Sequence, residues 1–511
     1  MIFSTKNKEQ IKQQGLTLNQ VNKQLETFKQ GVKPVRIIEA AKINNGIERI
    51  EVEEQKKLIT YYEVHKDRMQ IIKFVPASGA ATRMFKFIHQ FIKDYNPNKE
   101  PLKEFLLKTP YKNELITFFQ NRKKFAFFKK WKTKSKKIYG SNKGLKKGKR
   151  WHLLAKTLLE KKGLNYGNLP KGLIPFHLYE NKPVTAFYEQ LYEACHYASV
   201  EKNVYLHFTI SKKHVKKFKK EFKKIKEQLT RLTGLNYHLS YSFQQQKTDT
   251  ITVDLNNNPI SDKEGKLVFR PSGHGALLNN LNKLNADLIF IKNIDNVTTR
   301  EHTPEIKQYK KLLAGKLLFL QNKIFKIIRR LETEATAETI NEARALLHQE
   351  LSIKNAPLAK DKLITLLNRP LRVCGMVKNT GAPGGGPFWV IDNDNTLSLQ
   401  IVELSQIDTS DPNQKKIIEQ ATHFNPVDIV CSIKNYKGDK FNLSHFTNPD
   451  WKIITQKSLN GKPVKVLELP GLWNGATANW NTVFVEVPLS TFKPVKTVND
   501  LLKPTHQTQQ S

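Results

Sequence analysis

The sequence predicts an α/β protein with a Rossmann-like, mixed and mostly parallel sheet flanked by helices, a helical N-terminal region and a β-rich C-terminal lobe. Short apolar runs alternate with helically periodic segments over about residues 70–300, which is the pattern of a mostly parallel sheet. The first residues are polar and periodic, and the last part is rich in Gly, Pro, Asn and Trp. The predicted regions are therefore 1–66 (helical), 67–300 (α/β core with an insertion at about 95–165), 301–368 (helical) and 369–511 (β-rich lobe).

In the first region, apolar residues recur at helical spacing, and we expect helix over 16–25 and over 35–41. The pattern changes at residue 71, where the apolar run IIKFVPASGA ends in small residues. The helically periodic segment TRMFKFIHQFIKDY follows this run. A strand, a tight loop and a helix in this order open an α/β unit.

The same two patterns predict the other elements of the core. Apolar runs predict strands at 204–210, 237–243, 250–254, 267–270 and 287–293. Periodic segments predict helices at 184–198, 214–230 and 275–284.

The composition limits the class of protein. The chain has 511 residues, and 85 Lys and Arg against 46 Asp and Glu give a formal net charge of +39. A hydrophobic content of 39% excludes a wholly disordered polycation. Cys195, Cys374 and Cys431 are far apart and odd in number, which excludes a disulfide framework and a CxxC zinc site. Without a recognisable signal peptide or a long apolar run, we expect a cytoplasmic protein that does not contact membranes and binds anions.

The densest charge lies in Asn121–Arg150, which has 14 basic residues and no acidic ones. Aromatic residues alternate with its lysines, namely Phe125, Phe127, Phe128, Trp131 and Tyr139. Charge that tracks phosphates and rings that stack on bases are typical of nucleic-acid binding, so nucleic acid is one predicted partner. The alternative is a general lysine enrichment of the chain, which would give the same composition.

A second basic run, Ser211–Glu227, has a different pattern. Val215, Phe218, Phe222 and Ile225 recur at three- and four-residue spacing. This spacing predicts an amphipathic helix whose basic face is solvated.

The loop after the first core strand has chemical content. Its small residues, at 77–81, allow a ligand to approach the backbone closely. We expect the next helix to begin beside Thr82 and to aim its free N–H groups at the loop, where Arg83 adds a forked donor for phosphate oxygens. The loop has neither the Walker nor the GxGxxG pattern. The alternative interpretation is a tight packing turn.

Eight short segments, in the same order along the chain, resemble motifs of the sugar-nucleotide pyrophosphorylases, and in particular of the UDP-N-acetylhexosamine and UDP-sugar branch. They are SGAATR at 78–83, NLPKGLIP at 168–175, FQQ at 243–245, RPSGHGAL at 270–277, NIDN at 293–296, IVELSQI at 401–407, FNPVDI at 424–429 and FKPVK at 492–496. The loop PASGAATRM is also similar to that of an uncharacterised bacterial family.

The resemblance implies a nucleotidyltransferase-like fold and a Mg²⁺-dependent reaction. A nucleoside triphosphate, with UTP favoured, and a sugar 1-phosphate would give a nucleotide sugar and pyrophosphate. Such chemistry depends on positioning and on stabilising charge. By the resemblance, Ser78, Gly79 and Arg83 would hold the triphosphate and Lys171 would neutralise the leaving pyrophosphate. Asp295 would hold Mg²⁺.

The resemblance also implies residues for the base and the sugar. The nucleotide-binding positions would be Gln244, Gln245, Gly273 and Gly275. Glu403 and Asn425 would bind sugar hydroxyls. Lys496 would bind the sugar phosphate. It would act in catalysis together with Arg83 and Lys171.

Several of these positions have a structural alternative. Asp295 lies in a sequence that also suits a turn, and His274 between two glycines is either a turn residue or a catalytic one. Glu403 is either a sugar ligand or part of the solvent face of a strand. The loops at 381–389 and 470–480 match no motif, and are either a wall for a sugar ring or packing corners.

The chain departs from the family pattern in three ways. Ala81 replaces a loop glycine, which would cost about 1 kcal/mol or more at a positive φ. Ser272 and Asp428 stand where the family has Asp and Asn. Arg83 and Lys171 lie 88 positions apart instead of a few, which places the basic stretch on an insertion beside the nucleotide. These departures leave a second hypothesis open, a protein of this fold that binds nucleic acid or another anionic polymer without turnover.

Overall fold

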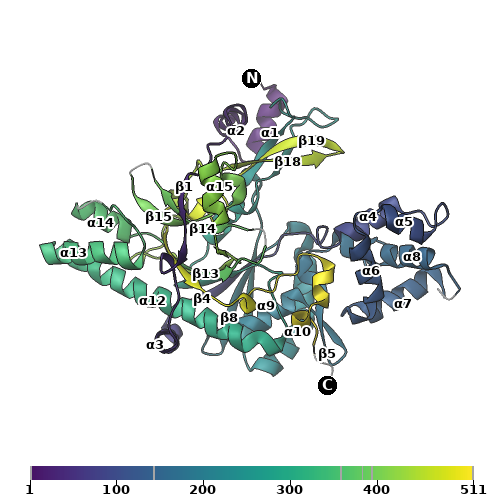
Figure 1. The fold of residues 1–511 in the computed structure, drawn as a ribbon, viewed down its shortest axis with the longest axis horizontal. Coiled ribbons are helices and arrows are strands. Elements are labelled where there is room, and N and C mark those ends of the chain that lie inside the picture. The colour runs from purple at the N-terminus through teal and green to yellow at the C-terminus, as the bar shows by residue number, and fades with distance from the viewer. Residues whose placement is uncertain (1–2, 142–143, 357–358, 382–383, 393–394, 509–511) are drawn as a thin grey trace. The chain divides into compact units, whose positions relative to one another are not determined.

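The computed structural model describes residues 3–141, 144–356, 359–381, 384–392 and 395–508 (Figure 1). The chain forms two compact units, each assembled from three segments. Unit 1 comprises Met1–Phe74, Ser242–Ile291 and Tyr309–Leu489, and unit 2 comprises Val75–Tyr241, Lys292–Gln308 and Ser490–Ser511. The predicted fold class is confirmed: the protein is mixed α/β, with a mostly parallel central sheet, flanking helices and a β-rich C-terminal region.

Most of the central sheet belongs to unit 1. Its strands, in order across the sheet, are β2 (Lys42–Ile43), β3 (Gly46–Glu48), β20 (Asn481–Glu486), β13 (Leu371–Lys378), β17 (Asp428–Ser432), β12 (Leu288–Lys292) and β4 (Ile71–Pro76). The pairs β3–β20, β20–β13 and β12–β4 are parallel, whereas β13–β17 is antiparallel. All five residues of β12 are buried, because a strand inside a parallel sheet is covered on both faces.

The short strand β16 (His423–Phe424) pairs with β13, and unit 1 also contains two smaller antiparallel sheets. One has the order β11 (Phe269–Pro271), β10 (Asp249–Val253), β19 (Lys462–Glu468) and β18 (Ile453–Leu459), and the other β1 (Ile37–Ala40), β14 (Gly386–Ile391) and β15 (Leu397–Val402). The helices α1 (Thr5–Gln13) and α2 (Leu18–Gln30) share an apolar core with the first of these sheets. A capping box between Thr17 and Gln20 fixes the start of α2.

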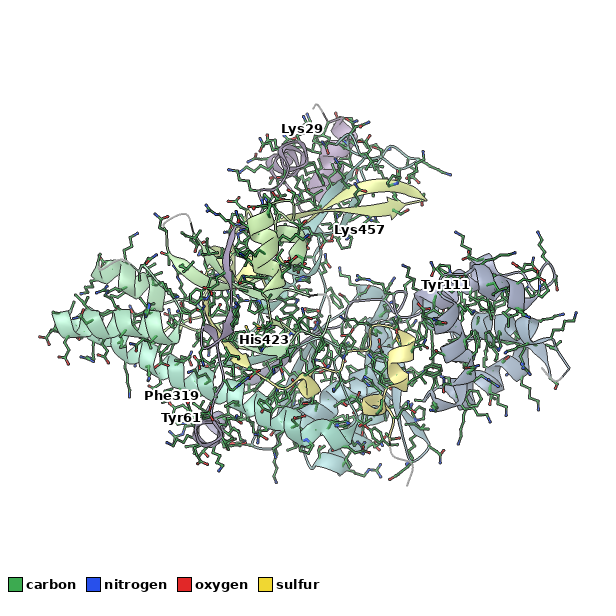
Figure 2. All side chains as sticks on the ribbon, in the orientation of Figure 1. Lys29, Tyr61, Tyr111, Phe319, His423 and Lys457 are labelled. Carbon is green, nitrogen blue, oxygen red and sulfur yellow. The ribbon has the colours of Figure 1, made fainter. Side chains whose placement is uncertain are left out.

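The longest helix of the chain, α12 (Thr303–Thr333), lies mostly in unit 1. The ring of Phe319 on this helix meets the ring of Tyr61, on α3 (Val52–His65), edge to face at 5.9 Å (Figure 2). The shorter helices of unit 1 are α11 (Leu278–Leu281), α13 (Ala337–Ala345), α14 (Lys360–Leu367) and α15 (Pro412–Glu419).

The helix predicted over 35–41 is wrong, because Ile37–Ala40 is the strand β1 and pairs with β14. Ile37 is buried and Ile38 is exposed, so the apolar residues follow a period of two here. Pairing with a strand far away in sequence decides between the two periods. The helix expected over 275–284 is also shorter, since a 3₁₀ turn at His274–Leu277 precedes α11.

Unit 2 contains the strands β7 (Ser199–Val200) and β8 (Asn203–Thr209), most of β9 (Asn236–Ser242), and a hairpin of β5 (Pro175–Tyr179) and β6 (Lys182–Thr185). Its helices after the hairpin are α9 (Ala186–Ala194) and α10 (Val215–Thr233). Phe218, Ile225 and Leu229 of α10 are buried. Most of its lysines are exposed, so the predicted amphipathic helix is confirmed.

The predicted insertion is a helical subdomain of unit 2 (Figure 1). The helices within the predicted bounds of about 95–165 are α5 (Leu102–Lys108), α6 (Lys112–Gln120), α7 (Phe128–Tyr139) and α8 (Lys147–Leu159). The helix α4 (Lys86–Asp94) precedes these bounds and shares the same apolar core. Phe125, Phe127 and Trp131 are at most 2% exposed and form part of this core, and the Trp131 indole donates to the carbonyl of Leu154 at 2.8 Å. The idea that these three rings stack on bases is therefore wrong. The rings lie on the buried face of a packed helical layer, and most of the lysines between them lie on its exposed face. In the part of the chain that is described, no helix is long and apolar enough to cross a membrane.

The C-terminal segment is attached to unit 2 through His506, which is 2% exposed. Its Nδ1 lies 3.0 Å from Nε2 of His177, and Nδ1 of His177 lies 2.7 Å from a carboxylate oxygen of Glu189. Burial, followed by the neighbouring His177, lowers the pKa of His506 to about 3. The unfolded chain therefore binds this proton more readily than the folded one, and stability falls as the pH drops from about 6.5 towards 3.

Between pH 7 and pH 5, we expect His506 to cost the protein about 2 kcal/mol of unfolding free energy, because each pH unit below the unfolded pKa contributes about 1.4 kcal/mol. Urea unfolding at both pH values measures this loss. The variant His506→Gln should lose correspondingly less between the two pH values. An equal pH dependence in the two proteins would contradict the assignment.

Candidate functional site

The candidate site in unit 2 is built on the ends of two neighbouring parallel strands. The segments that follow β4 and β12 leave the sheet at the same edge, because Ile71–Phe74 pairs in parallel register with Leu288–Ile291. The amide of Ile294 donates to the carbonyl of Pro76 at 3.3 Å, which joins the two segments. Ligands of open α/β sheets bind at this kind of edge.

The segment at 168–175, which contains Pro-Lys-Gly, meets the small-residue loop at 77–81, although 88 positions separate Arg83 from Lys171 in the sequence. Ala80 and Pro170 form an antiparallel bridge. The amide of Ala81 donates to the carbonyl of Leu169 at 3.0 Å, and the amide of Lys171 donates to the carbonyl of Gly79 at 3.2 Å. The helical insertion therefore leaves and re-enters the chain at this loop, as the motif order predicts.

Lys171 and Asp295 form the charged centre of this site. The Lys171 ammonium donates to Oδ2 of Asp295 at 2.7 Å and to the carbonyl of Val495 at 2.8 Å. The two side chains are 14% and 22% exposed, so the pair is partly covered and still reachable from solvent. Three segments far apart in sequence thus converge on one ammonium group.

Asn296 extends this centre. Its side-chain oxygen accepts from the amide of Lys493 at 3.0 Å, which holds the segment before Val495 in place. Its Nδ2 is buried and has no hydrogen-bond partner among the described residues. A buried amide nitrogen without an acceptor is unusual and is compatible with a ligand at this position.

Ser78, Arg83 and Lys496 are exposed. Among the described residues, the side chains of Arg83 and Lys496 make no hydrogen bond or ion pair. Lys496 directly follows Val495, whose carbonyl accepts from Lys171. Lys496 therefore lies next to a residue that contacts the lysine–carboxylate pair, and Arg83 lies two residues after the loop residue Ala81.

The predicted start of the helix is wrong by several residues. Turns occupy residues 81–85, and α4 begins at Lys86, so its first N–H groups do not start beside Thr82. Ala81 has no positive φ, and neither does Gly79. The predicted strain at Ala81 is therefore absent, and an added Cβ on Gly79 would meet nothing within 4 Å.

Of the predicted nucleotide-binding residues, Ser78 and Gly79 belong to unit 2, whereas the two glutamines and the two glycines at 244–275 belong to unit 1. The Asn280 side chain donates to Oγ of Ser242 at 2.7 Å and to the carbonyl of Phe243 at 3.0 Å. These bonds connect the F-Q-Q segment (243–245) to α11, the helix that follows the glycine loop at 270–277. Gln244 and Gln245 are half-buried, and Nε2 of Gln244 is without a partner in the described chain.

Gly273 and Gly275 are required by backbone geometry and packing. Gly273 has a φ of 80°, and a Cβ on Gly275 would lie 2.1 Å from the carbonyl oxygen of Pro470. The loop at 470–480 therefore packs directly on the glycine loop at 270–277. Ser272, which replaces the Asp of the family pattern, is buried and donates its hydroxyl to the carbonyl of Thr248.

His274 and Glu403 lie together within unit 1. Nε2 of His274 is 3.3 Å from Oε1 of Glu403, and Nδ1 accepts from the amide of Leu472 at 2.9 Å. Because Nδ1 is an acceptor, the neutral ring carries its proton on Nε2 and donates it to the carboxylate. Trp473 stacks on the ring at 5.6 Å, and the Asn474 amide donates to the same carboxylate oxygen at 3.3 Å. Glu403 is thus held in place by several contacts and is not a free residue of a solvent face.

Asn425 is buried, with a strained neighbour. Its side-chain oxygen accepts from the amide of Val427 at 2.8 Å, and its Nδ2 is another orphaned donor of the described chain. Val427 has a φ of 59°, which is rare for a β-branched residue. Residues with such strained backbone angles cluster at functional sites. Asp428, in place of the family's Asn, forms a fully buried ion pair with Lys310.

The motifs did not indicate several of these residues. The roles of Lys310, Asn474 and the carbonyl of Val495 depend on contacts between segments far apart in sequence. Asn296 lies in the NIDN motif at 293–296, so its position next to Asp295 could have indicated it. The loop at 381–389 includes residues 382–383, which lie outside the described residues.

The fold and these residues define a mixed α/β protein. Lys171, Asp295 and the small-residue loop at 77–81 come together where two of its parallel strands end. The chain belongs to the family described as "Domain of unknown function (DUF4301)", whose model matches residues 4–507.

Solved structures to which the chain is similar include two trypanosomatid enzymes. One is the uridine diphosphate N-acetylglucosamine pyrophosphorylase of Trypanosoma brucei, with 12% identity, a TM-score of 0.44 and coverage of 94% of this chain and 74% of that chain. Another is the UDP-glucose pyrophosphorylase of Leishmania major, with 12% identity, a TM-score of 0.43 and coverage of 98% and 78%. No curated protein matches the sequence.

Proposed function

We propose that the protein is a nucleotidyltransferase that joins a nucleoside triphosphate, with UTP favoured, to a sugar 1-phosphate and releases pyrophosphate. One observation carries the proposal: the backbone bonds between residues 79–81 and 169–171 bring the loop beside the Lys171–Asp295 pair. The order of the eight motifs supports it independently. The cluster offers the positive charge and backbone access that a triphosphate needs.

In this proposal, a phosphate oxygen of the sugar 1-phosphate attacks the α-phosphorus in line. The bond from the α-phosphorus to the oxygen bridging it to the β-phosphate breaks, and pyrophosphate leaves. Arg83 and the loop amides hold the triphosphate, and Lys171 neutralises negative charge on the leaving group. Lys496 is assigned to the sugar phosphate.

Asp295 is the residue proposed to hold Mg²⁺. The described chain contains no group of three His, Cys, Asp or Glu residues placed to hold a metal ion. A single carboxylate still fits Mg²⁺, which keeps waters and takes phosphate oxygens of its substrate as ligands. The ion would supply charge stabilisation at the phosphates.

The proposed roles in unit 1 are those of the base and sugar. Gln244 and Gln245 are assigned to the base edge, beside the glycine loop. Glu403 is assigned to the sugar hydroxyls, and the donor that His274 directs at its carboxylate would keep it oriented. Asn425 has an orphaned Nδ2 that a sugar hydroxyl would satisfy.

Pyrophosphate release tests the proposal. The purified protein is incubated with Mg²⁺, each nucleoside triphosphate and a panel of sugar 1-phosphates. Release with one pair and not with either substrate alone supports it, and no release with any pair contradicts it.

We expect Gly79→Ala to separate ligand contact from folding. The unfolding free energy should change by less than about 0.5 kcal/mol, because the position has an ordinary φ and open space. The KM for the nucleoside triphosphate should rise about tenfold or more, because the methyl group would occupy the surface against which the phosphates lie. Urea unfolding and initial rates measure the two effects, and an unchanged KM would show that the triphosphate does not lie on Gly79.

A second candidate function is binding of an anionic polymer by the helical subdomain. Lys130, Lys132, Lys136 and Lys137 of α7 are exposed, and the run that contains them has no acidic residue. Because Phe125, Phe127 and Trp131 are buried, such binding would depend mainly on phosphate charge and would fall steeply with salt. Tight, salt-sensitive RNA or DNA binding together with no pyrophosphate release would favour this function.

A further inference from the structure

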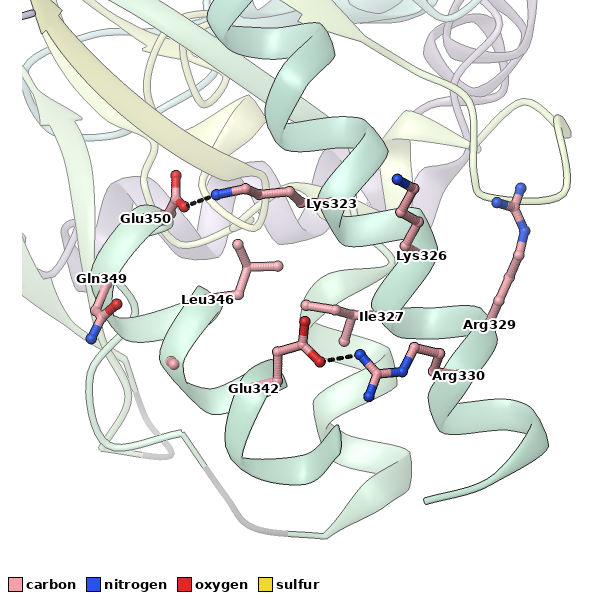
Figure 3. Close-up of a pocket in the computed structure, with 10 residues that line it drawn as sticks. Lys323, Lys326, Ile327, Arg329, Arg330, Glu342, Leu346, Gln349 and Glu350 are labelled. Atoms are coloured by element: carbon pink, nitrogen blue, oxygen red, sulfur yellow. Dashed lines mark hydrogen bonds and ion pairs between the residues drawn. The ribbon is translucent and has the colours of Figure 1, made fainter. Parts of the chain in front are cut away.

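A pocket of about 560 Å³ lies within unit 1 between the C-terminal part of α12 and the segment formed by α13 and the turn that follows it (Figure 3). Its apolar surface comes from Ile327, Ala345 and Leu346. Ile327 and Leu346 are themselves buried parts of the core. The volume is in the range of sites for small organic molecules.

The rim of the pocket is basic. Four basic residues of α12 line the pocket, namely Lys323, Lys326, Arg329 and Arg330. With two acidic residues in the lining, Glu342 and Glu350, the formal charge of the pocket is +2.

Two of the four cations are neutralised and two are not. The Lys323 ammonium contacts Glu350 at 2.5 Å, and Arg330 is paired with Glu342 (Figure 3). Lys326 and Arg329 have no carboxylate partner in the described chain, and Arg329 gives one N–H to the carbonyl of Tyr436 at 3.0 Å. The surplus charge of the rim is therefore located at these two side chains.

The backbone on the opposite wall is irregular. Leu346–Glu350 is a π-helical turn, closed by a hydrogen bond of 3.1 Å from the amide of Leu351 to the carbonyl of Leu346. Ser352 follows with a φ of 53°. Single π-helical turns occur frequently at functional sites, and here the turn presents Gln349 and Glu350 to the pocket.

We propose that this pocket binds a small organic phosphate monoester. Its apolar body would lie on Ile327, Ala345 and Leu346. A dianionic phosphate group would match the surplus charge of +2 and would bind the ammonium of Lys326 and the forked guanidinium of Arg329. Nothing in the proposal depends on the nucleotidyltransferase reaction.

Isothermal titration of the full chain with phenyl phosphate tests this site. The variant Lys326→Gln/Arg329→Gln removes the two uncommitted cations, and Ala345→Trp fills the apolar surface. The matched control is Arg344→Gln/Lys362→Gln, which removes the same charge from exposed positions outside the pocket. Thermal melts confirm that each variant is folded.

We expect saturable binding by the wild type and by the control. Binding should weaken at least about tenfold in the double variant, because two charge-assisted contacts are lost, and in Ala345→Trp. Inorganic phosphate should bind more weakly than phenyl phosphate.

Three results would overturn the proposal. The first is no saturable binding by the wild type. The second is an equal loss in the double variant and its control, and the third is equal affinity for inorganic phosphate and phenyl phosphate. If Ala345→Trp does not fold, the double variant and its control still decide the outcome.

Discussion

Replacing Asp295 by asparagine is expected to reduce nucleotidyl transfer at least a thousandfold, about 4 kcal/mol of transition-state stabilisation. The amide keeps the shape of the side chain and can still accept from Lys171, which now bonds the carboxylate at 2.7 Å. It loses the negative charge on which the proposed Mg²⁺ site depends. Because the position is 22% exposed, we expect the fold to be retained. Initial rates at saturating substrates, with circular dichroism as a check of folding, measure the effect.

Three further variants sharpen this result. Asp450→Asn makes the same chemical change at an exposed carboxylate and should leave the rate unchanged. Lys171→Met should also be strongly impaired. The double variant with Asp295→Asn should be little slower than the worse single variant, because residues that act as a unit are not additive. Full activity of Asp295→Asn would show that the metal assignment is wrong. The proposed reaction is tested separately, by the pyrophosphate assay.

Lys310→Met is expected to destabilise unit 1 by about 3–5 kcal/mol, because it leaves the buried carboxylate of Asp428 without its cation. Both side chains of this pair are at most 4% exposed. Removing both charges in Lys310→Met/Asp428→Leu should recover most of the loss, since a buried ion pair can be replaced by apolar residues of similar size. Urea unfolding of the wild type, the single variant and the double variant measures the series.

The matched control for this series is Lys311→Met. Lys311 is the next residue on α12, and its partner Glu63 is 35% exposed, so water can solvate the carboxylate that remains. We expect a loss of less than about 1 kcal/mol there. Similar losses for Lys310→Met and Lys311→Met would contradict the view that burial makes the first pair important.

The sequence predicted the fold class well because its strongest patterns are local. The amphipathic helix α10 and the buried strand β12 follow directly from periodicity and from an apolar run. Strand β1 was missed because four residues fit either period, and a distant partner decides the outcome. The buried aromatic residues around Trp131 were misread because composition does not show which face of a helix is covered.

The candidate site was predictable in part. Motif order placed the loop, Lys171 and Asp295 at one location, and the contacts in unit 2 agree with that placement. The partner of Asp428 was not predictable, because Lys310 lies 118 residues away and belongs to no motif. Side chains that are fixed by tertiary contacts alone leave no local signal in a single sequence.

The meeting of Gly79 with Lys171 across the helical insertion has a consequence for how the molecule folds. Closing the loop of 92 residues between Gly79 and Lys171 costs about 2 kcal/mol more chain entropy than closing one of about eight residues, by the logarithmic dependence on loop length. A subdomain that collapses first around its own aromatic core shortens the effective loop. We therefore expect the insertion to fold before the phosphate-side residues come together, so that the chemical centre of unit 2 is a late product of folding.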